Sequence, residues 1–430
     1  MIPLGYYLQR EKGVEVLYLA GNEEAKKLSG RVVEASLPTV ECEEKDEEVQ
    51  TMDSKSFIGR LFVGCFPSSP ISQEIDSLTL LQARSLRLLK RIRPTHIGLY
   101  GDFNLGYDMP LIWAAKLLDI KSVVLPVIKS VPDFIAQSRI KIGGEFLARG
   151  SLLGKVVSFF FPHQVHFYKG EKCFFYHPRT VLALLFSRML SPRPWIYGGG
   201  NSDYVFVTGE NEKIFLESNM VRKSRIKVTG QYSHDAIYEQ WSKREQARGD
   251  LYEEYELDKK QKLIVVALPQ LAEHKLRDWE AHDEEVNFLL ETLSNLSANV
   301  LISLHPKMAM ERYKPLEKSF SVRIAEQRLS QLIASADLFV AGFESTVLWS
   351  ILVKVPPVFL AYLQLGQDLS RYQSVTNVNK KAQLQDRLQE VLEKGGRREA
   401  LKKEAPKMGM LDGKCGERIY EQLCRTEACS

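Results

Sequence analysis

The sequence predicts an α/β protein with two Rossmann-like domains facing a central cleft. Short apolar strands alternate with amphipathic helices in two separate series, one at 95–128 and one at 262–361. A charged segment with helical character, 236–260, lies between the two series. At 430 residues the chain is long enough for two or three domains of about 150 residues. Strands that alternate with helices pair in parallel through right-handed crossovers.

Composition supports a folded protein with an ample core. Hydrophobic residues make up 44% of the chain and charged residues 26%, which is an ordinary globular balance. The six cysteines include no CxxC pair, which favours reduced thiols in a cytoplasm. No apolar run reaches about 18 residues and the N-terminus lacks a long apolar region, so we expect neither secretion nor a membrane span.

The first series begins before residue 95. We expect a strand and a helix in 13–28, a solvated acidic loop at 41–55 and a strand at 59–66. Helical spacing then predicts a helix over 78–94 that stops at Pro94. The elements that follow are a strand at 95–102, a helix at 111–120 and a strand at 121–128. We assign residues 1–205 to the N-terminal domain.

The second series resumes after a less regular stretch. Strands are expected at 203–209, 224–235, 262–269, 299–306, 322–325, 337–342 and 356–361, with helices at 284–297, 330–336 and 345–353. We assign 206–375 to a C-terminal Rossmann-like domain and 376–430 to C-terminal helices, for which we consider a return to the first domain.

Two strand ends of the second domain carry polar side chains. LISLHPKM (301–308) is an apolar strand that stops on His305, Pro306 and Lys307, and proline fixes how the chain leaves the strand. AGFESTVLWSIL (341–352) is a strand followed by a helix start with Ser345 and Thr346. Taken singly, the histidine reads as a loop residue and the hydroxyls as helix caps. Together they predict a phosphate or pyrophosphate site, because ligands bind at the carboxyl ends of parallel strands.

The order of these motifs resembles that of two-Rossmann-domain (GT-B) nucleotide-sugar enzymes, which include UDP-N-acetylglucosamine 2-epimerases and many bacterial glycosyltransferases. The resemblance rests on HIGLYGDFNLGYDMPLIWAAKLLDIKSVVLP in the first domain. In the second it rests on SDYVFVTGENEKIFLESNMVRKSRIKVTGQYSHDAIY, then LHP, then ADLFVAGFESTVLWSILVKVPPVFL. It covers 95–128 and 203–365.

Two departures from the epimerase pattern are visible. The epimerases carry a His-Arg-Arg-Glu run after the first strand of the second domain, whereas this chain has ALPQLAEHKLRDW (267–279) with a displaced His274. They also carry Ser-Gly-Gly followed by a glutamate, where this chain has Glu344, Ser345 and Thr346. The His-Pro and Ser-Thr pair is more similar to bacterial sialyltransferases, Kdo-transferases and capsule polymerases. That resemblance implies that His305 and Ser345 or Thr346 bind the phosphate of a nucleotide donor, often a cytidine nucleotide.

The resemblance implies a metal-independent glycosyltransferase without a cofactor. It would move a sugar from a CMP- or UDP-linked donor to a hydroxyl of a cell-surface glycan such as capsule or lipopolysaccharide. The expected donor-binding residues are His305, Pro306, Lys307, Glu344, Ser345, Thr346 and Gly230. Glycosyl transfer needs a base to take the acceptor proton, and a carboxylate with a raised pKa suits that role. Asp102 is our first choice and Asp108 the second, and each could instead be a turn or capping residue.

Two other functions fit the same sequence. A nucleotide-sugar 2-epimerase or hydrolase would use the fold without an acceptor site and would release free sugar when no acceptor is present. A non-catalytic nucleotide-sugar-binding scaffold would bind the donor without turnover.

The segment 129–195 is basic and aromatic, with ten basic and three acidic residues between Lys129 and Trp195. It could be a solvated cover over the first domain, or its aromatic side chains could lie on an anionic membrane surface. The aromatic residues considered are Phe159, Phe160, Phe161, Phe174, Phe175 and Trp195. The second reading places a cytoplasmic enzyme at the inner face of the cell membrane, near a lipid-linked acceptor. No nucleic-acid-binding module accompanies the charge, so nucleic acid is not an expected partner.

Overall fold

The computed structural model describes residues 2–20, 39–41, 56–127, 132–365 and 368–427. The chain forms two compact units, and each is described by itself. The first unit contains Met1–Thr208, Glu212–Gln231 and Gly416–Ser430. The second unit contains Gly209–Asn211 and Tyr232–Cys415.

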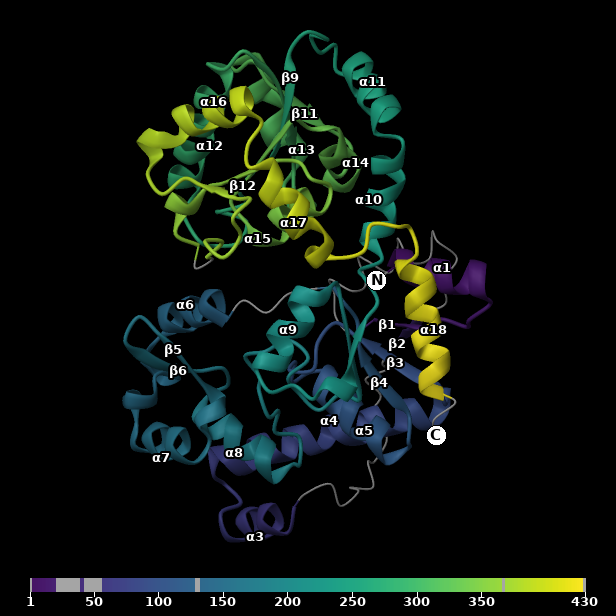
Figure 1. The fold of residues 1–430 in the computed structure, drawn as a ribbon. Coiled ribbons are helices and arrows are strands. Elements are labelled where there is room, and N and C mark those ends of the chain that lie inside the picture. The colour runs from purple at the N-terminus through teal and green to yellow at the C-terminus, as the bar shows by residue number, and fades with distance from the viewer. Residues whose placement is uncertain (1, 21–38, 42–55, 128–131, 366–367, 428–430) are drawn as a thin grey trace. The chain divides into compact units, whose positions relative to one another are not determined.

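The first unit is built on a parallel sheet with the strand order β3-β4-β7-β8 (Figure 1). A parallel pair, β1-β2, and an antiparallel hairpin, β5-β6, form separate small sheets. The strands of this unit are β1 (Tyr18–Ala20), β2 (Thr39–Glu41), β3 (His96–Leu99), β4 (Lys121–Val124), β5 (Val165–Tyr168), β6 (Glu171–Phe174), β7 (Tyr204–Val207) and β8 (Ile226–Val228). Its helices are α1 (Ile2–Lys12), α3 (Phe57–Cys65), α4 (Pro70–Ile92), α5 (Asp108–Leu117), α6 (Pro132–Ile142), α7 (Leu152–Phe160), α8 (Pro178–Phe186) and α9 (Glu210–Ser218).

Local sequence explains the long helix α4. Ser69 caps its first turn by accepting the backbone N–H of Ser72, and Pro70 occupies the first helical position, where a missing N–H costs nothing. The helix ends at Arg93, whose backbone is left-handed, directly before Pro94. The predicted helix over 78–94 is therefore present and begins eight residues earlier.

The predicted strand at 59–66 is wrong, because residues 59–65 lie in helix α3, which ends at Cys65. Ser56 caps the helix by accepting the N–H of Gly59, and Phe62 packs against Phe186 of α8 with the ring centres 5.3 Å apart. A short apolar run fits a buried strand and a buried helix turn equally well, so the start signal at Ser56 decides. The helix expected within 13–28 and the acidic loop at 41–55 fall mostly outside the described residues.

The second unit is a doubly wound sheet with all strands parallel and the order β11-β10-β9-β12-β13-β14 (Figure 1). Its strands are β9 (Lys262–Ala267), β10 (Ala298–Ser303), β11 (Arg323–Ala325), β12 (Leu338–Ala341), β13 (Pro357–Phe359) and β14 (Thr376–Asn377). Its helices are α10 (Ser233–Ser242), α11 (Arg244–Glu254), α12 (Trp279–Ser294), α13 (Met310–Tyr313), α14 (Leu329–Leu332), α15 (Glu344–Leu352), α16 (Leu384–Lys394) and α17 (Arg398–Met408).

Both faces of the second sheet are covered, which explains why its strands read as continuous apolar runs. Along β9, Leu263 and Val265 point into one core, which is completed by side chains of α10, α11, α14, α15 and α17. Ile264 and Val266 point into the other core, which is completed by α12, α13 and α16. The alternating residues of one strand thus join two hydrophobic layers, and the chain can form a Rossmann-like unit.

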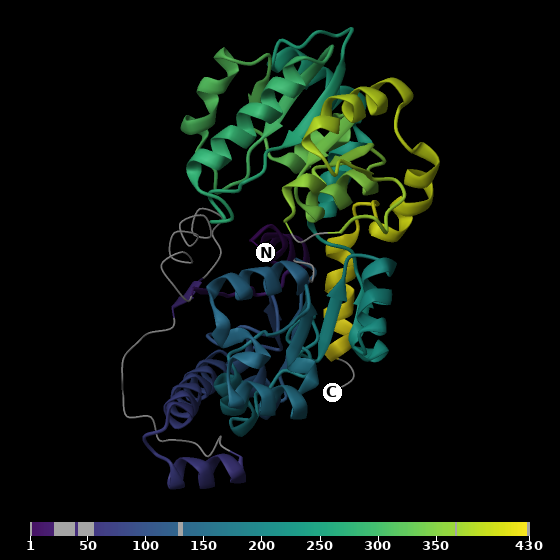
Figure 2. The same cartoon turned by 90° about the vertical axis from the view of Figure 1, so that its left-hand side faces the viewer.

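The last helix, α18 (Cys415–Glu427), belongs to the first unit from Gly416 onward and is yellow in Figure 2. Arg418 on this helix donates from Nε to the carbonyl of Thr229, just beyond β8, at 2.9 Å. Among the described residues, no helix has the length and hydropathy that crossing a bilayer requires.

Candidate functional site

The carboxyl ends of β10, β9 and β12 meet at one edge of the second sheet. These strands are neighbours, and their last residues, Ser303, Ala267 and Ala341, lie in register. From β9 the chain continues to β10 and β11 on one side of the sheet and then crosses to β12 and β13 on the other side, so the strand order reverses between β9 and β12. Ligands of open α/β sheets bind at such a switch point.

His305 presents a hydrogen-bond donor at this edge. The backbone N–H of Lys307 donates to Nδ1 of His305 at 3.2 Å, so the proton of the neutral ring lies on Nε2. Burial lowers the pKa of His305, and the nearby His274 and Lys307 lower it further. The neutral imidazole therefore offers one N–H, and the half-buried ring can donate it to an oxyanion.

His274 lies beside His305, which the sequence did not predict. Its ring centre is 5.9 Å from that of His305 and 6.0 Å from that of Phe343. Burial lowers the pKa of His274, Lys307 lowers it further, and Glu273 opposes the decrease. The histidine that follows β9 is thus part of the same cluster, although its position in the sequence differs from the epimerase pattern.

Helix α15 begins next to the histidines without a side-chain cap. Phe343 occupies the capping position and makes no side-chain hydrogen bond to the first turn. Thr346 donates to the carbonyl of Phe343 at 3.0 Å, while Ser345 is exposed. The first N–H groups of the helix have no partner within it, and they favour an anion together with the helix dipole. The side chain of Glu344 lies outside the described residues.

A buried hydrogen-bonded chain supports the histidine pair. Nε2 of His282 lies 2.8 Å from the hydroxyl of Tyr313, which donates to Glu273 at 2.6 Å. Because Tyr313 donates its own proton to the carboxylate, His282 must donate to the tyrosine. The second carboxylate oxygen of Glu273 is buried and has no hydrogen-bond partner among the described residues. This chain fixes a negative charge next to His274.

In the first unit, Asp102 is a bracing carboxylate. It was our first choice for the base, but its side chain is only 1% exposed. One oxygen accepts the N–H of Gly198 at 3.1 Å, and the other accepts the N–H of Gly200 at 2.7 Å and the hydroxyl of Ser202 at 3.1 Å. Arg225 lies 3.8 Å from the second oxygen. Asp102 therefore holds the loop that precedes β7, and Gly198, Gly199 and Gly200 are buried rather than open.

Asp108 has the properties expected of a base. It is the first residue of α5, which follows the carboxyl end of β3, and its side chain is half-buried. Burial raises its pKa to about 7, the backbone of Asn104 opposes the increase, and the negative charge of Asp102 adds to it. A carboxylate with this pKa exchanges a proton near neutral pH. Of the two carboxylates, Asp108 is the one whose side chain is partly exposed.

The remaining predicted residues are spread over both units. Gly230, at the turn after β8 in the first unit, has a φ of +81°, a left-handed conformation that favours glycine. Pro306 and Lys307 are exposed at the end of β10 in the second unit. The second unit therefore brings His305, Lys307, Ser345 and Thr346 to one sheet edge, and the first unit carries Asp102, Asp108 and Gly230.

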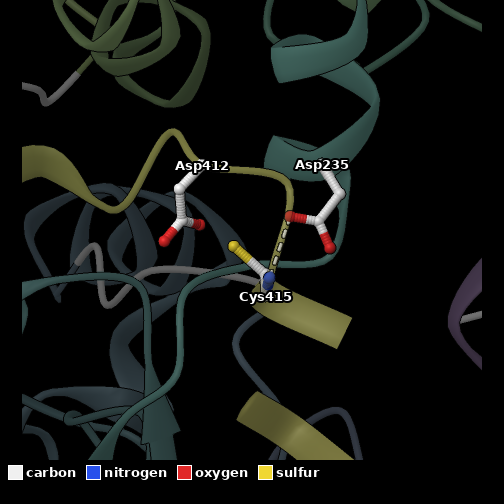
Figure 3. Close-up of side chains that lie close together, drawn as sticks. All are labelled: Asp235, Asp412 and Cys415. Carbon is white, nitrogen blue, oxygen red and sulfur yellow. Dashed lines mark hydrogen bonds between the residues drawn. The ribbon is translucent and has the colours of Figure 1, made fainter. Parts of the chain in front are cut away.

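One group of potential metal ligands occurs among the described residues, Asp235, Asp412 and Cys415 (Figure 3). Backbone groups explain both carboxylates. Asp235 accepts the N–H of Cys415 at 2.9 Å, where α18 begins, and Asp412 accepts the N–H of Lys414 at 3.1 Å. These are ordinary capping and turn contacts, so the group by itself gives no reason to place a metal here.

Comparison with known proteins identifies the fold. No protein-family model and no curated protein sequence matches the chain. Among solved structures it is similar to the UDP-GlcNAc 2-epimerase of Neisseria meningitidis bound to UDP-GlcNAc, with 12% identity, a TM-score of 0.51 and coverage of 99% of this chain and 96% of the other. The S. aureus MnaA–UDP structure gives 12% identity, a TM-score of 0.51 and coverage of 99% and 92%.

The UDP-GlcNAc 2-epimerase of Methanocaldococcus jannaschii gives 14% identity, a TM-score of 0.50 and coverage of 99% and 96%. These likenesses extend over almost the whole of each chain, while few residues are identical. The protein therefore has the two-Rossmann-domain (GT-B) fold that the UDP-GlcNAc 2-epimerases share.

Proposed function

We propose that this protein is a nucleotide-sugar enzyme and, more specifically, a glycosyltransferase. The observation that carries the proposal is the convergence of His305, His274 and the uncapped start of α15 at the switch point of the second sheet. The histidine rings and the first turn of α15 can offer N–H donors, and Lys307 adds a positive charge close to both histidines. Such donors suit the phosphate of a leaving nucleotide, because they stabilise charge as it develops and need no reorganisation.

We propose Asp108 as the base that takes the proton of the acceptor hydroxyl. Its pKa of about 7 leaves a large ionised fraction at neutral pH and still allows it to hold a proton. Asp102 would not take the proton itself, because both of its oxygens already accept hydrogen bonds. It would raise the pKa of Asp108 and hold the loop 198–200 in place. The acceptor would be a hydroxyl of a cell-surface glycan, such as capsule or lipopolysaccharide.

The transferase, the epimerase or hydrolase and the scaffold differ in the products that they release and in whether they need an acceptor. The enzyme is incubated with CMP- and UDP-linked sugars, with and without a bacterial glycan fraction, and free nucleotide, free sugar and the epimeric sugar are measured. A transferase releases nucleotide rapidly only with the acceptor present. Free or epimerised sugar in the absence of the acceptor would instead support the hydrolase or 2-epimerase. Donor binding without consumption in either condition would support the scaffold.

We also propose that helix α7 contacts an anionic membrane surface. Leu152, Val156, Phe159 and Phe160 are spaced on one stripe of this helix, and their side chains are 79%, 47%, 79% and 67% exposed. Lys155 is exposed beside the stripe. Phe174, Phe175 and Trp195, in contrast, are buried in the core, so only part of the aromatic segment could meet lipid. An exposed apolar stripe flanked by positive charge is typical of interfacial helices.

Vesicle sedimentation tests this part of the proposal. The wild type should sediment with phosphatidylglycerol-containing vesicles and much less with pure phosphatidylcholine, since each basic residue near an anionic surface contributes about 1 kcal/mol. The double substitution Phe159→Ser and Phe160→Ser should reduce binding at least tenfold. Leu117→Ser, which changes an exposed apolar residue of α5, is the control and should bind like the wild type. Equal binding by all three proteins would rule out α7 as the contact.

A further inference from the structure

A basic pocket lies in the first unit, away from Asp108. It has a volume of about 270 Å³ and is lined by the loop before β7, the chain between α9 and β8, and the end of α5. Four of its lining residues are basic and one is acidic: Lys116, Arg193, Arg222 and Arg225 against Asp203. The volume is slightly below the range of about 300–1,000 Å³ that is usual for ligand pockets, so a small anion fits it better than a whole nucleotide.

The pocket is at the edge of the sheet opposite to the proposed base. Asp203 directly precedes β7 and Arg225 directly precedes β8, so the amino ends of these strands border it. Lys116 and Asp108 are eight residues apart on α5, which corresponds to about 12 Å along the helix. The pocket therefore requires an explanation separate from glycosyl transfer.

Of the four positive charges of this pocket, only that of Arg225 has an ion-pair partner among the described residues, namely Asp102. Lys116, Arg193 and Arg222 form no ion pair with any described residue. Asp203 is already engaged, because one of its oxygens accepts both the N–H and the hydroxyl of Ser122, at 2.8 and 2.6 Å. Desolvation lowers the pKa of Lys116, Asp203 opposes the decrease, and Arg225 and Arg222 add to it. These basic groups thus repel one another, and a bound anion would relieve the repulsion.

Arg225 has an unused donor inside the protein. Its Nη2 donates to Ser202 at 3.0 Å and to the carbonyl of Gly198 at 3.3 Å, which fixes the guanidinium. Its Nε is buried and has no hydrogen-bond partner among the described residues. A buried N–H without a partner costs about 1–3 kcal/mol, so an unfilled donor at a pocket wall indicates a missing acceptor.

The loop that forms the wall is tightly fitted. A Cβ at Gly199 would lie 2.6 Å from the carbonyl oxygen of Arg193, and a Cβ at Gly200 would lie 2.4 Å from that of Asp102. Glycine is therefore needed at both positions, because the protein's own backbone occupies the space that a Cβ would take, and the wall of the pocket is fixed. The carboxyl-terminal ends of α5 and α9 would each favour one nearby cation through the helix dipole. This effect does not explain why Arg193 is present or why Nε of Arg225 has no hydrogen-bond partner in the described part of the chain.

We propose that this pocket binds a phosphate or pyrophosphate group independently of the nucleotide at His305. Arginine guanidinium groups pair with phosphate oxygens in fork geometry, and Lys116 adds a point charge. The ligand class is a small phosphate-bearing anion, and none of the four basic side chains that would hold it is among the residues proposed to bind the donor or to take the acceptor proton.

Hydrogen–deuterium exchange resolved by peptide tests the proposal on the full chain. Sodium pyrophosphate is titrated at constant ionic strength, and exchange is followed in peptides covering 190–203 and 218–226. The expected result is saturable protection of both peptides. Peptides covering 303–308 and 341–348 report the second unit in the same sample, so binding at His305 is recognised as a different event.

Charge variants assign the protection to the pocket. Arg193→Gln combined with Arg222→Gln should weaken the apparent affinity at least tenfold, and both side chains are partly exposed, so folding should persist. Lys223→Gln, which removes the neighbouring exposed charge that does not line the pocket, should match the wild type, as should His305→Ala. No saturable protection of 190–203 and 218–226, or protection unchanged in the double variant, would overturn the proposal.

Discussion

The two units differ in the charge of the polar groups that form their candidate sites. The second unit offers neutral donors at its switch point, where burial keeps His274 and His305 uncharged beside the start of α15. The first unit concentrates ionisable groups, with Asp108 at the start of α5 and four basic residues around the pocket near its end, one of which, Arg225, is paired with Asp102. Neutral donors suit a charge that appears and leaves during a reaction, whereas fixed charges suit proton transfer and lasting anion binding.

The largest expected effect is on turnover. Asp108→Asn removes the proposed base and should lower kcat by about 10²–10⁴-fold, while donor affinity changes little. In the wild type, kcat/KM should decrease below pH 7, because protonation inactivates a base with a pKa of about 7. Initial rates over pH 5–9 measure both. Turnover within threefold of the wild type would assign the base elsewhere.

Asp102→Asn provides the contrasting variant. It leaves the buried Arg225 without its charge partner and weakens the contacts that hold Gly198 and Gly200, so the free energy of unfolding should decrease by about 3 kcal/mol. Urea unfolding measures this. Losing the negative charge should also shift the acid limb of the pH profile to lower pH, since Asp102 raises the pKa of Asp108. A stable Asp102→Asn protein without any activity would make Asp102 the base instead.

The two units should also respond to pH with opposite signs. Asp108 has its pKa raised from 3.8 to about 7 on folding, so the native state holds more protons between these values and stability decreases as pH increases through this range. Asp108→Asn should therefore gain about 2–3 kcal/mol relative to the wild type between pH 5 and pH 8.

His305 should behave in the reverse manner. Its pKa is lowered on folding, so the unfolded state takes up more protons and stability decreases as pH falls below 6.5. His305→Asn should lose less stability than the wild type on acidification from pH 7 to pH 5. Unfolding curves at several pH values measure both variants, and the same sign of change in both would contradict the comparison.

The smallest expected effect concerns the hydrogen bonds that join His282, Tyr313 and Glu273 near His274. Tyr313→Phe removes the hydroxyl that joins His282 to Glu273, and the free energy of unfolding should decrease by about 1–3 kcal/mol. Because the hydroxyl no longer shields Glu273, nucleotide binding should change slightly, by less than tenfold. A loss of binding as large as that of His305→Ala would place Tyr313 in the site itself.

The fold was predictable because each unit has a regular pattern. Strands such as β9 and β10 are continuous apolar runs bounded by turn residues, and His305 and Ser345 could be located because they follow such runs. The conformation of 59–66 could not be predicted, because an apolar run of that length occurs both in helices and in strands.

The burial and hydrogen bonding of individual side chains could not be predicted from the sequence. Asp102 lies in the loop after β3 and Asp108 begins α5 six residues later. Only the tertiary contacts of Asp102 with Gly198 and Gly200 distinguish the fully hydrogen-bonded carboxylate from the partly exposed one. His274 could have been found, because a histidine closely follows the first strand of the second unit. Its approach to His305 depends on how the loop after β9 folds over the sheet edge.

Nucleotide binding tests the central claim most directly. Thermal unfolding is measured with CMP, CDP, UDP, GDP and ADP for the wild type, His305→Ala and the exposed control Lys223→Gln. A ligand at 100 times its Kd should add about 2.7 kcal/mol of apparent stability. The account predicts that a pyrimidine nucleotide stabilises the wild type and the control, and that His305→Ala loses most of this effect. Stabilisation by no nucleotide, or equal stabilisation of His305→Ala, would contradict it.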